Sequence, residues 1–150
     1  MKLAEALQER AALNTRINQL RNRLTANATM QEGVAPAEDP NELLTELERC
    51  YAEIETLIVR INLTNSRAKV SGEPLTALLA RRDCLKSRIN ALQNLCDAAS
   101  DLGNRYSKTE IRMLSAVNVK ELRKELDRLS ADLRQLDNAI QAANWSIELK

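Results

Sequence analysis

Residues 118–147 read NVKELRKELDRLSADLRQLDNAIQAANWSI and carry the clearest structural pattern in the chain. Its apolar residues recur in strict alternation of three and four, at Val119, Leu122, Leu126, Leu129, Leu133, Leu136, Ile140, Ala143 and Ile147. That spacing places them on one face of an α-helix. Asn118 and Glu121 supply an N-cap and an N3 partner at its start. The stretch therefore predicts one long amphipathic helix.

Three earlier segments show the same periodicity, separated by the few places where Gly, Pro and turn residues collect. The second of these begins with clear signals, because Asp39 can cap the helix, Pro40 suits its first position and Glu42 follows as in a capping box. We predict a mainly α protein that forms a single helical domain over residues 1–150. Its expected helices span 2–26, 40–65, 74–100 and 118–147.

Charged residues beside the apolar faces predict which helices pair. A short connection makes neighbouring helices antiparallel, and the g positions of their heptads then face one another. In the first two helices, one register forms three pairs of opposite charge: Arg23–Glu46, Arg16–Glu53 and Glu9–Arg60. In the last two helices, another register forms two such pairs: Arg81–Asp132 and Arg88–Glu125. Each exposed pair contributes only about 0.2–1 kcal/mol, so we expect charge to select the register and apolar burial to supply the stability.

The second predicted helix has an unusually wide apolar face, because Leu44, Tyr51 and Ile58 occupy its e positions. Such a face is too wide for a two-stranded pairing and needs a second layer. We therefore expect two antiparallel helical hairpins that form an elongated four-helix bundle or coiled-coil arms. The second layer comes either from the same chain or from another copy.

The composition excludes most catalytic chemistry. The chain has no histidine, so it offers neither a Ser-His-Asp triad nor an imidazole metal ligand. Its three cysteines, Cys50, Cys84 and Cys96, show no C-x-x-C spacing, and we expect no metal and no cofactor. The net charge of +1 disfavours a general attraction to nucleic acid or acidic membranes. We find no signal peptide or membrane span and expect a cytoplasmic protein that is not an enzyme.

Two connecting stretches alternate with a period near two, namely 30–34 and 111–117. This pattern predicts a short β ribbon at one end of the molecule, although Ser107 and Glu110 also fit the start of a helix. The tripeptide Arg-Ile-Asn begins at Arg16, Arg60 and Arg88. It indicates either a faint duplication or convergent helix patterning.

Five residues are candidates for contacts with a partner: Arg10, Tyr51, Arg82, Tyr106 and Trp145. The two arginines lie on apolar faces, where they either specify register or extend their charged ends to water. Aromatic residues are rare in this chain, and such rings are enriched at binding surfaces. For Tyr106 and Trp145 the alternative is that they close the ends of the bundle, whereas Tyr51 belongs to the wide apolar face of the second helix.

Several short motifs, in matching order along nearly the full chain, resemble the septicolysin-like family of small bacterial proteins. They include Met30-Gln31-Glu32-Gly33, Arg60-Ile61-Asn62-Leu63-Thr64-Asn65, Ala80-Arg81-Arg82-Asp83, Tyr106-Ser107-Lys108-Thr109-Glu110-Ile111 and Ala143-Asn144-Trp145. The family label implies a cytolysin, but the resemblance supplies no catalytic, metal-binding or pore-lining residues.

The sequence favours a non-enzymatic cytoplasmic protein that self-associates as a dimer or higher oligomer, or that scaffolds protein partners. A membrane-active cytolysin is the first alternative. The second is binding of nucleic acid or another polyanion through a stripe formed by Arg16, Arg23, Arg81 and Arg88, although each has an acidic partner in the proposed register. We expect neither a membrane nor a nucleic acid as the partner.

Overall fold

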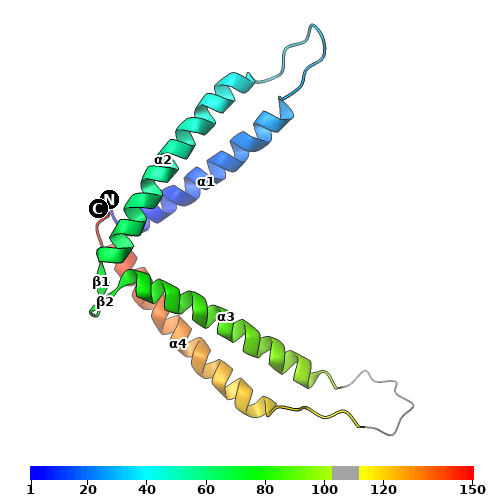
Figure 1. The fold of residues 1–150 in the computed structure, drawn as a ribbon, viewed down its shortest axis with the longest axis vertical. Helices are drawn as coiled ribbons and strands as arrows, with labels where there is room; N and C mark the ends of the chain where they lie inside the picture. The colour runs from blue at the N-terminus through cyan, green and yellow to red at the C-terminus, as the bar shows by residue number, and fades with distance from the viewer. Residues whose placement is uncertain (103–111) are drawn as a thin grey trace. The chain divides into compact units, whose positions relative to one another are not determined.

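The computed structural model describes residues 1–102 and 112–150 and is almost entirely helical (Figure 1). Its elements are α1 (Leu3–Ala26), α2 (Pro40–Arg67), β1 (Lys69–Val70), β2 (Glu73–Pro74), α3 (Leu75–Ser100) and α4 (Val119–Ser146). The four predicted helices are confirmed, and their predicted bounds differ from the observed ones by at most two residues. The chain divides into two compact units, Met1–Lys69 with Ala142–Lys150 and Val70–Gln141, which we describe separately.

The predicted caps begin two of these helices. The carboxylate of Asp39 accepts a hydrogen bond from the amide of Asn41 at 2.9 Å, and Pro40 follows as the first residue of α2. The side-chain oxygen of Asn118 accepts from the amide of Glu121 at 3.2 Å and caps α4. Both caps satisfy backbone N–H groups that a helix start otherwise leaves without partners.

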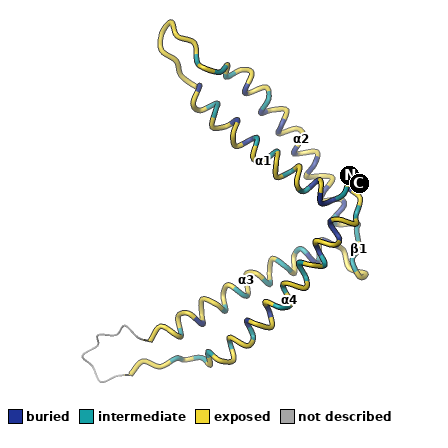
Figure 2. Tube along the Cα trace, turned by 180° about the vertical axis from the view of Figure 1, so that it is seen from behind, coloured by how far each residue is buried: buried dark blue, intermediate teal, exposed yellow. Residues whose placement is uncertain are grey.

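In the first unit, α1 and α2 pack side by side as an antiparallel hairpin (Figure 1). Their facing apolar residues form one buried seam along the hairpin, shown in dark blue in Figure 2. The seam contains Ile17, Leu20, Leu43, Leu47, Cys50 and Ile54, with Leu13 and Leu24 packed against it. Burial of this seam is the main source of stability for a hairpin of two long helices.

α3 and α4 form a second hairpin with a thinner core (Figure 2), and all of it except the last residues of α4 belongs to the second unit. Leu126 and Leu129 of α4 are buried, whereas Ile89 and Leu92 of α3 are only half-buried. Arg88 of α3 and Glu125 of α4 form an ion pair at 3.5 Å, so the predicted register of this hairpin is confirmed at that position.

The small antiparallel sheet is present, but other residues form it than those we predicted. β1 and β2 follow α2 directly and pair across Ser71 and Gly72. The predicted segments 30–34 and 112–117 contain no strand, and Ile111 lies outside the described residues. The prediction was wrong because alternation over so few residues also occurs in irregular connections.

The chain ends meet in the first unit, where N and C lie together in Figure 1. Lys2 and Glu148 form an isolated antiparallel bridge. The amide of Leu3 donates to the carbonyl of Ile147, and that of Leu149 donates to the carbonyl of Met1, both at 2.9 Å.

The two hairpins also match position by position. α3 begins 72 residues after α1, and α4 begins and ends 79 residues after α2. With these shifts, every residue of α1 and α2 has an equivalent position in α3 and α4. The second shift is larger by seven because α3 is two residues longer than α1 and the connection inside the second hairpin is five residues longer.

Candidate functional site

The strongest candidate site is an apolar row on α2 that the hairpin does not cover. Leu44, Tyr51 and Ile58 follow one another at heptad spacing and remain 47%, 43% and 38% exposed. We call these three residues the α2 row. Large apolar side chains in such an arrangement mark binding surfaces more often than isolated exposed ones do.

A shallow groove of about 560 Å³ lies beside the α2 row, between α1 and α2. Tyr51 and Ile58 of the row line it, together with Asn14, Ile17, Asn18, Arg21, Ile54, Glu55 and Val59. Two of these residues, Ile17 and Ile54, belong to the buried seam, so the groove reaches down to the core of the hairpin. A ridge of apolar side chains could therefore bury further surface here.

The two edges of this surface differ in charge. Glu48 and Glu55 each lie one helical turn after a member of the α2 row, so they form an acidic edge along α2. The opposite edge, on α1, presents the amide side chains of Asn14 and Asn18 and the guanidinium of Arg21. The surface thus joins an apolar centre to one acidic edge and one hydrogen-bond-donating edge.

The second hairpin has no such row. The positions of α4 that are equivalent to Leu44, Tyr51 and Ile58 are occupied by Arg123, Ser130 and Asp137. α4 forms its hairpin with polar residues at these places. Packing within a hairpin therefore does not require the apolar residues of the α2 row.

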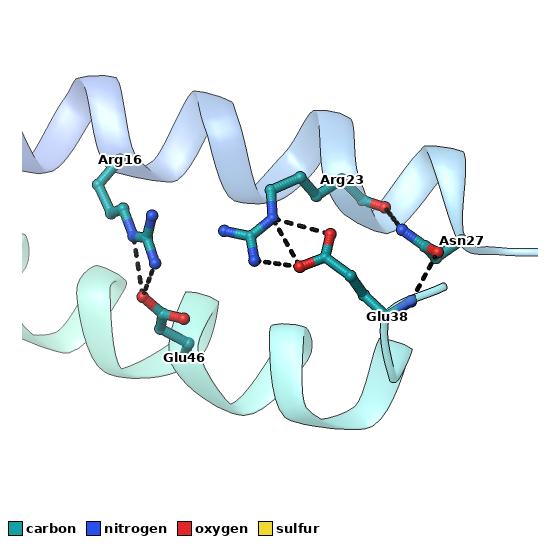
Figure 3. Close-up of polar contacts among 5 residues, drawn as sticks. All are labelled: Arg16, Arg23, Asn27, Glu38 and Glu46. Carbon is teal, nitrogen blue, oxygen red and sulfur yellow. Dashed lines mark hydrogen bonds and ion pairs between the residues drawn. The ribbon is translucent and has the colours of Figure 1, made fainter. Parts of the chain in front are cut away.

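On the other side of the α1–α2 hairpin, two arginines of α1 bind carboxylates (Figure 3). Nε of Arg16 donates to Glu46 at 2.8 Å, and Arg23 holds Glu38 through Nε and Nη2. The hydrogen bond from Arg23 lowers the pKa of Glu38 and raises the pKa of Arg23 itself. Asn27 supports this contact because its side-chain oxygen accepts from the amide of Glu38 at 3.1 Å.

The predicted pairs Arg23–Glu46, Arg16–Glu53 and Glu9–Arg60 are therefore wrong by about one heptad. Glu53 pairs instead with Arg49 on its own helix at 3.9 Å. Nε of Arg60 donates to the carbonyl of Lys150 at 3.2 Å. The buried seam sets the register because its burial outweighs exposed ion pairs of about 0.2–1 kcal/mol each.

The second hairpin gives a mixed result for its two predicted pairs. Arg88–Glu125 forms, but Arg81 binds Glu73 at 2.8 Å and Asp132 binds Arg128 at 3.3 Å. Across both hairpins, the four arginines of the hypothetical polyanion-binding stripe each pair with a glutamate. Their charge is thus neutralised locally.

Of the five predicted contact residues, Tyr51 alone lines the groove. Arg10 is half-buried, Arg82 pairs with the neighbouring Asp83 at 3.1 Å, and Trp145 is 54% exposed. Tyr106 lies outside the described residues. The five residues did not include Leu44 and Ile58, which complete the α2 row, although their e positions had already marked them as part of the wide apolar face.

Other kinds of site have no support in the described ranges 1–102 and 112–150. No group of three or more Cys, Asp or Glu residues there could hold a metal ion. No helix there has the length and apolar character that crossing a bilayer requires. All three cysteines are free; Cys50 and Cys96 are buried and Cys84 is exposed.

Comparison with known proteins identifies a relative that matches the full length of the chain. A crystal structure of a functionally unknown conserved protein from Corynebacterium diphtheriae is 40% identical, with a TM-score of 0.94, and the match covers 100% of this chain and 99% of that chain. No curated protein matches.

The septicolysin-like resemblance is wrong, since the family that matches is a different one. Each motif that suggested it is only three to six residues long and is not specific to one family. The expectation of cytolytic activity rested on that family label and falls with it. The chain belongs to the family of unknown function DUF6847, which matches residues 10–149.

Proposed function

We propose that this protein is a non-enzymatic cytoplasmic protein that acts by self-association, with the α2 rows of two copies packed against each other. The observation that carries the proposal is the exposure of Leu44, Tyr51 and Ile58 at positions where the equivalent helix α4 has polar residues. Exposed apolar side chains that the fold does not need cost solubility, so a function that uses them is the simplest reason for their presence.

A second copy is the occupant that best fits this row. Among the described residues, no other helix has exposed large apolar side chains at heptad spacing; α3 has Leu95 and α4 has Trp145. The best apolar match for the α2 row is therefore the same row on another molecule. Self-complementary contact of this kind is the usual basis of a twofold dimer.

The charged edges favour one orientation of the two copies. If the two α2 helices run parallel, the acidic edge of each copy meets the amide and Arg21 edge of the other. If they run antiparallel, Glu48 and Glu55 of one copy face the same residues of the other, and like charges repel. We therefore propose a parallel arrangement in which Tyr51 lies opposite Tyr51 of the second copy.

The other parts of the proposal rest on the residue inventory. The absence of histidine removes the most common general acid and base and supports a role without catalysis. Three free thiols support a reducing compartment such as the cytoplasm. The pairing of Arg16, Arg23, Arg81 and Arg88 with carboxylates speaks against a polyanion as the partner.

The chain supplies a matched variant to test this proposal. Leu44→Arg, Tyr51→Ser and Ile58→Asp together give α2 the residues that α4 has at the equivalent positions, so folding should be retained. Loss of a single hot-spot side chain costs about 2 kcal/mol of binding free energy, which corresponds to about 30-fold in Kd. We therefore expect the dimer Kd of the triple variant to rise by at least that factor. Sedimentation velocity over a concentration series measures this, and circular dichroism verifies the fold.

A control variant changes α2 away from the row. Thr45→Lys and Thr56→Gln also copy α4, at two exposed positions outside the α2 row. This variant should associate like the parent protein. A parent protein that stays monomeric at high concentration would overturn the proposal, as would a triple variant that associates as strongly as the parent. If the parent protein is monomeric and binds a helix of another protein at the α2 row, the self-association proposal is wrong and the partner is a different protein.

A further inference from the structure

The two hairpins share more than a common helical pattern. Ten of the 24 residues of α1 recur identically in α3 at a shift of 72, namely Leu3, Leu7, Arg10, Leu13, Arg16, Ile17, Asn18, Leu20, Asn22 and Ala26. Convergent patterning explains repeated leucines on a buried face. It does not explain why Arg10 and Arg82 both interrupt that face at equivalent positions.

Polar contacts repeat in the same way. The ion pair Arg16–Glu46 in the first hairpin is equivalent to Arg88–Glu125 in the second, with shifts of 72 and 79. The amide of Leu43 donates to the carbonyl of Asp39 at 3.2 Å, and the equivalent bond joins Leu122 to Asn118 at 3.0 Å. The ion pair connects the two helices of each hairpin, so the two hairpins repeat each other in three dimensions as well as in sequence.

The ends of the hairpins repeat as well. At the end of α2 the amide of Ala68 donates to Thr64, and at the end of α4 that of Ile147 donates to Ala143, at 2.8 and 2.9 Å. Before the first helix of each hairpin, the N-cap residues Lys2 and Pro74 are both extended, with ψ of 152° and 142°.

The equivalence extends to the strands that leave and enter the helices. β1 leaves α2 and pairs with β2, which enters α3. At the chain ends, Glu148 after α4 pairs with Lys2 before α1. The shifts make Glu148 equivalent to Lys69 of β1 and Lys2 equivalent to Pro74 of β2. The paired chain ends are thus a second copy of the joint that β1 and β2 make.

We infer that the chain is a fused tandem duplication of one helical hairpin, and that the strand at the open end of either hairpin fits the strand of a second hairpin of the same kind. The turn at Ser71 and Gly72 is the fusion point. Both residues have positive φ, 51° and 88°, as the two central residues of a type I′ turn require. At the chain ends, the shift of 79 makes Lys150 equivalent to Ser71. The shift of 72 places the equivalent of Gly72 one position before Met1, so this joint needs one added residue to form the same turn.

A set of circular permutants tests this inference on the full chain. The first permutant opens the chain between Ser71 and Gly72, and an initiator Met is added before Gly72. Its original ends are closed by the substitution Lys150→Ser and one inserted Gly, which connects residue 150 to Met1. This closure copies the Ser-Gly turn at the other joint. Two companions differ only in the closure: one joins residue 150 directly to Met1, and the other uses a flexible linker of six Gly and Ser residues.

If the two joints are equivalent, the one-glycine permutant folds and melts within about 4 °C of the parent protein. Direct closure should lower the Tm by more than that, because it is one residue too short for the turn. The inference is overturned if the one-glycine closure is no more stable than direct closure, or if it unfolds while the six-residue linker folds. The inference is also overturned if none of the three permutants folds, because the joint at the chain ends would then be unable to take over the role of the opened turn.

Discussion

At the scale of single residues, exposed charges follow the register of this molecule instead of setting it. Arg16 forms an ion pair with Glu46, and Arg23 forms one with Glu38. Heptad positions alone had predicted the carboxylates Glu53 and Glu46, which lie about one heptad further along the chain. A long arginine side chain reaches several carboxylates at little cost. A seam leucine has one place to pack, because neighbouring side chains fill the space around it. Apolar contacts are therefore the better predictor of register in such hairpins.

Glu148 gives a testable pH dependence at this scale. Hydrogen bonds from Lys2 and from the N-terminal amine lower its pKa in the folded protein. A carboxylate whose folded pKa lies below the unfolded value of about 4.3 stabilises the fold above that value, and the contribution is lost as the pH falls through the folded pKa. Glu148→Gln should therefore lower the Tm at pH 7 and have less effect near pH 3.

Thermal denaturation at both pH values measures this difference. Glu121→Gln is a suitable control because Glu121 contacts Lys124 on its own helix and its pairing is local. An equal loss of Tm at pH 7 and pH 3 for Glu148→Gln would show that charge at the chain ends does not stabilise the joint.

At the scale of the elements, the sequence predicts helices far better than strands or connections. The helix bounds could be predicted because each helix repeats its pattern over many turns and begins at a recognisable cap such as Asp39 or Asn118. The sheet could not be predicted, because β1 and β2 have only two residues each and pair through the turn at Ser71 and Gly72. The candidate site was predicted in part, since Tyr51 was singled out while Leu44 and Ile58 were assigned only to a wide apolar face.

Equivalent helix positions allow a prediction that compares the two hairpins. Leu20 of α1 is fully buried, whereas its equivalent Leu92 of α3 is half-buried. Leu20→Ala should cost about 2–5 kcal/mol of unfolding free energy, and Leu92→Ala should cost less because its site is already open to water. Urea denaturation followed by circular dichroism measures both. A larger loss for Leu92→Ala would mean that the second hairpin contributes more core stability than its burial indicates.

At the scale of the whole molecule, the inferred duplication and the proposed self-association share one physical rationale. A lone hairpin of two helices leaves much of its surface exposed, and it gains stability by pairing with another hairpin. The bridge between Lys2 and Glu148 joins the two ends of the chain within the first unit. The α2 row distinguishes the first hairpin from the second, because Arg123, Ser130 and Asp137 make the equivalent face of α4 polar. In the proposed function, the first hairpin therefore offers a surface for a further partner that the second hairpin lacks.

The orientation of that partner can be tested by disulfide formation between copies. In a Cys84→Ser background, which removes the exposed native thiol, Leu44→Cys and Tyr51→Cys are each oxidised as single variants. Parallel α2 helices place each residue opposite itself, so both variants should form covalent dimers, since a disulfide needs Cβ atoms about 4 Å apart. Antiparallel helices centred on Tyr51 would place Leu44 opposite Ile58, and only Tyr51→Cys would crosslink. Non-reducing gel electrophoresis separates the two arrangements, and crosslinking of Tyr51→Cys alone would contradict the parallel dimer while preserving the role of the row.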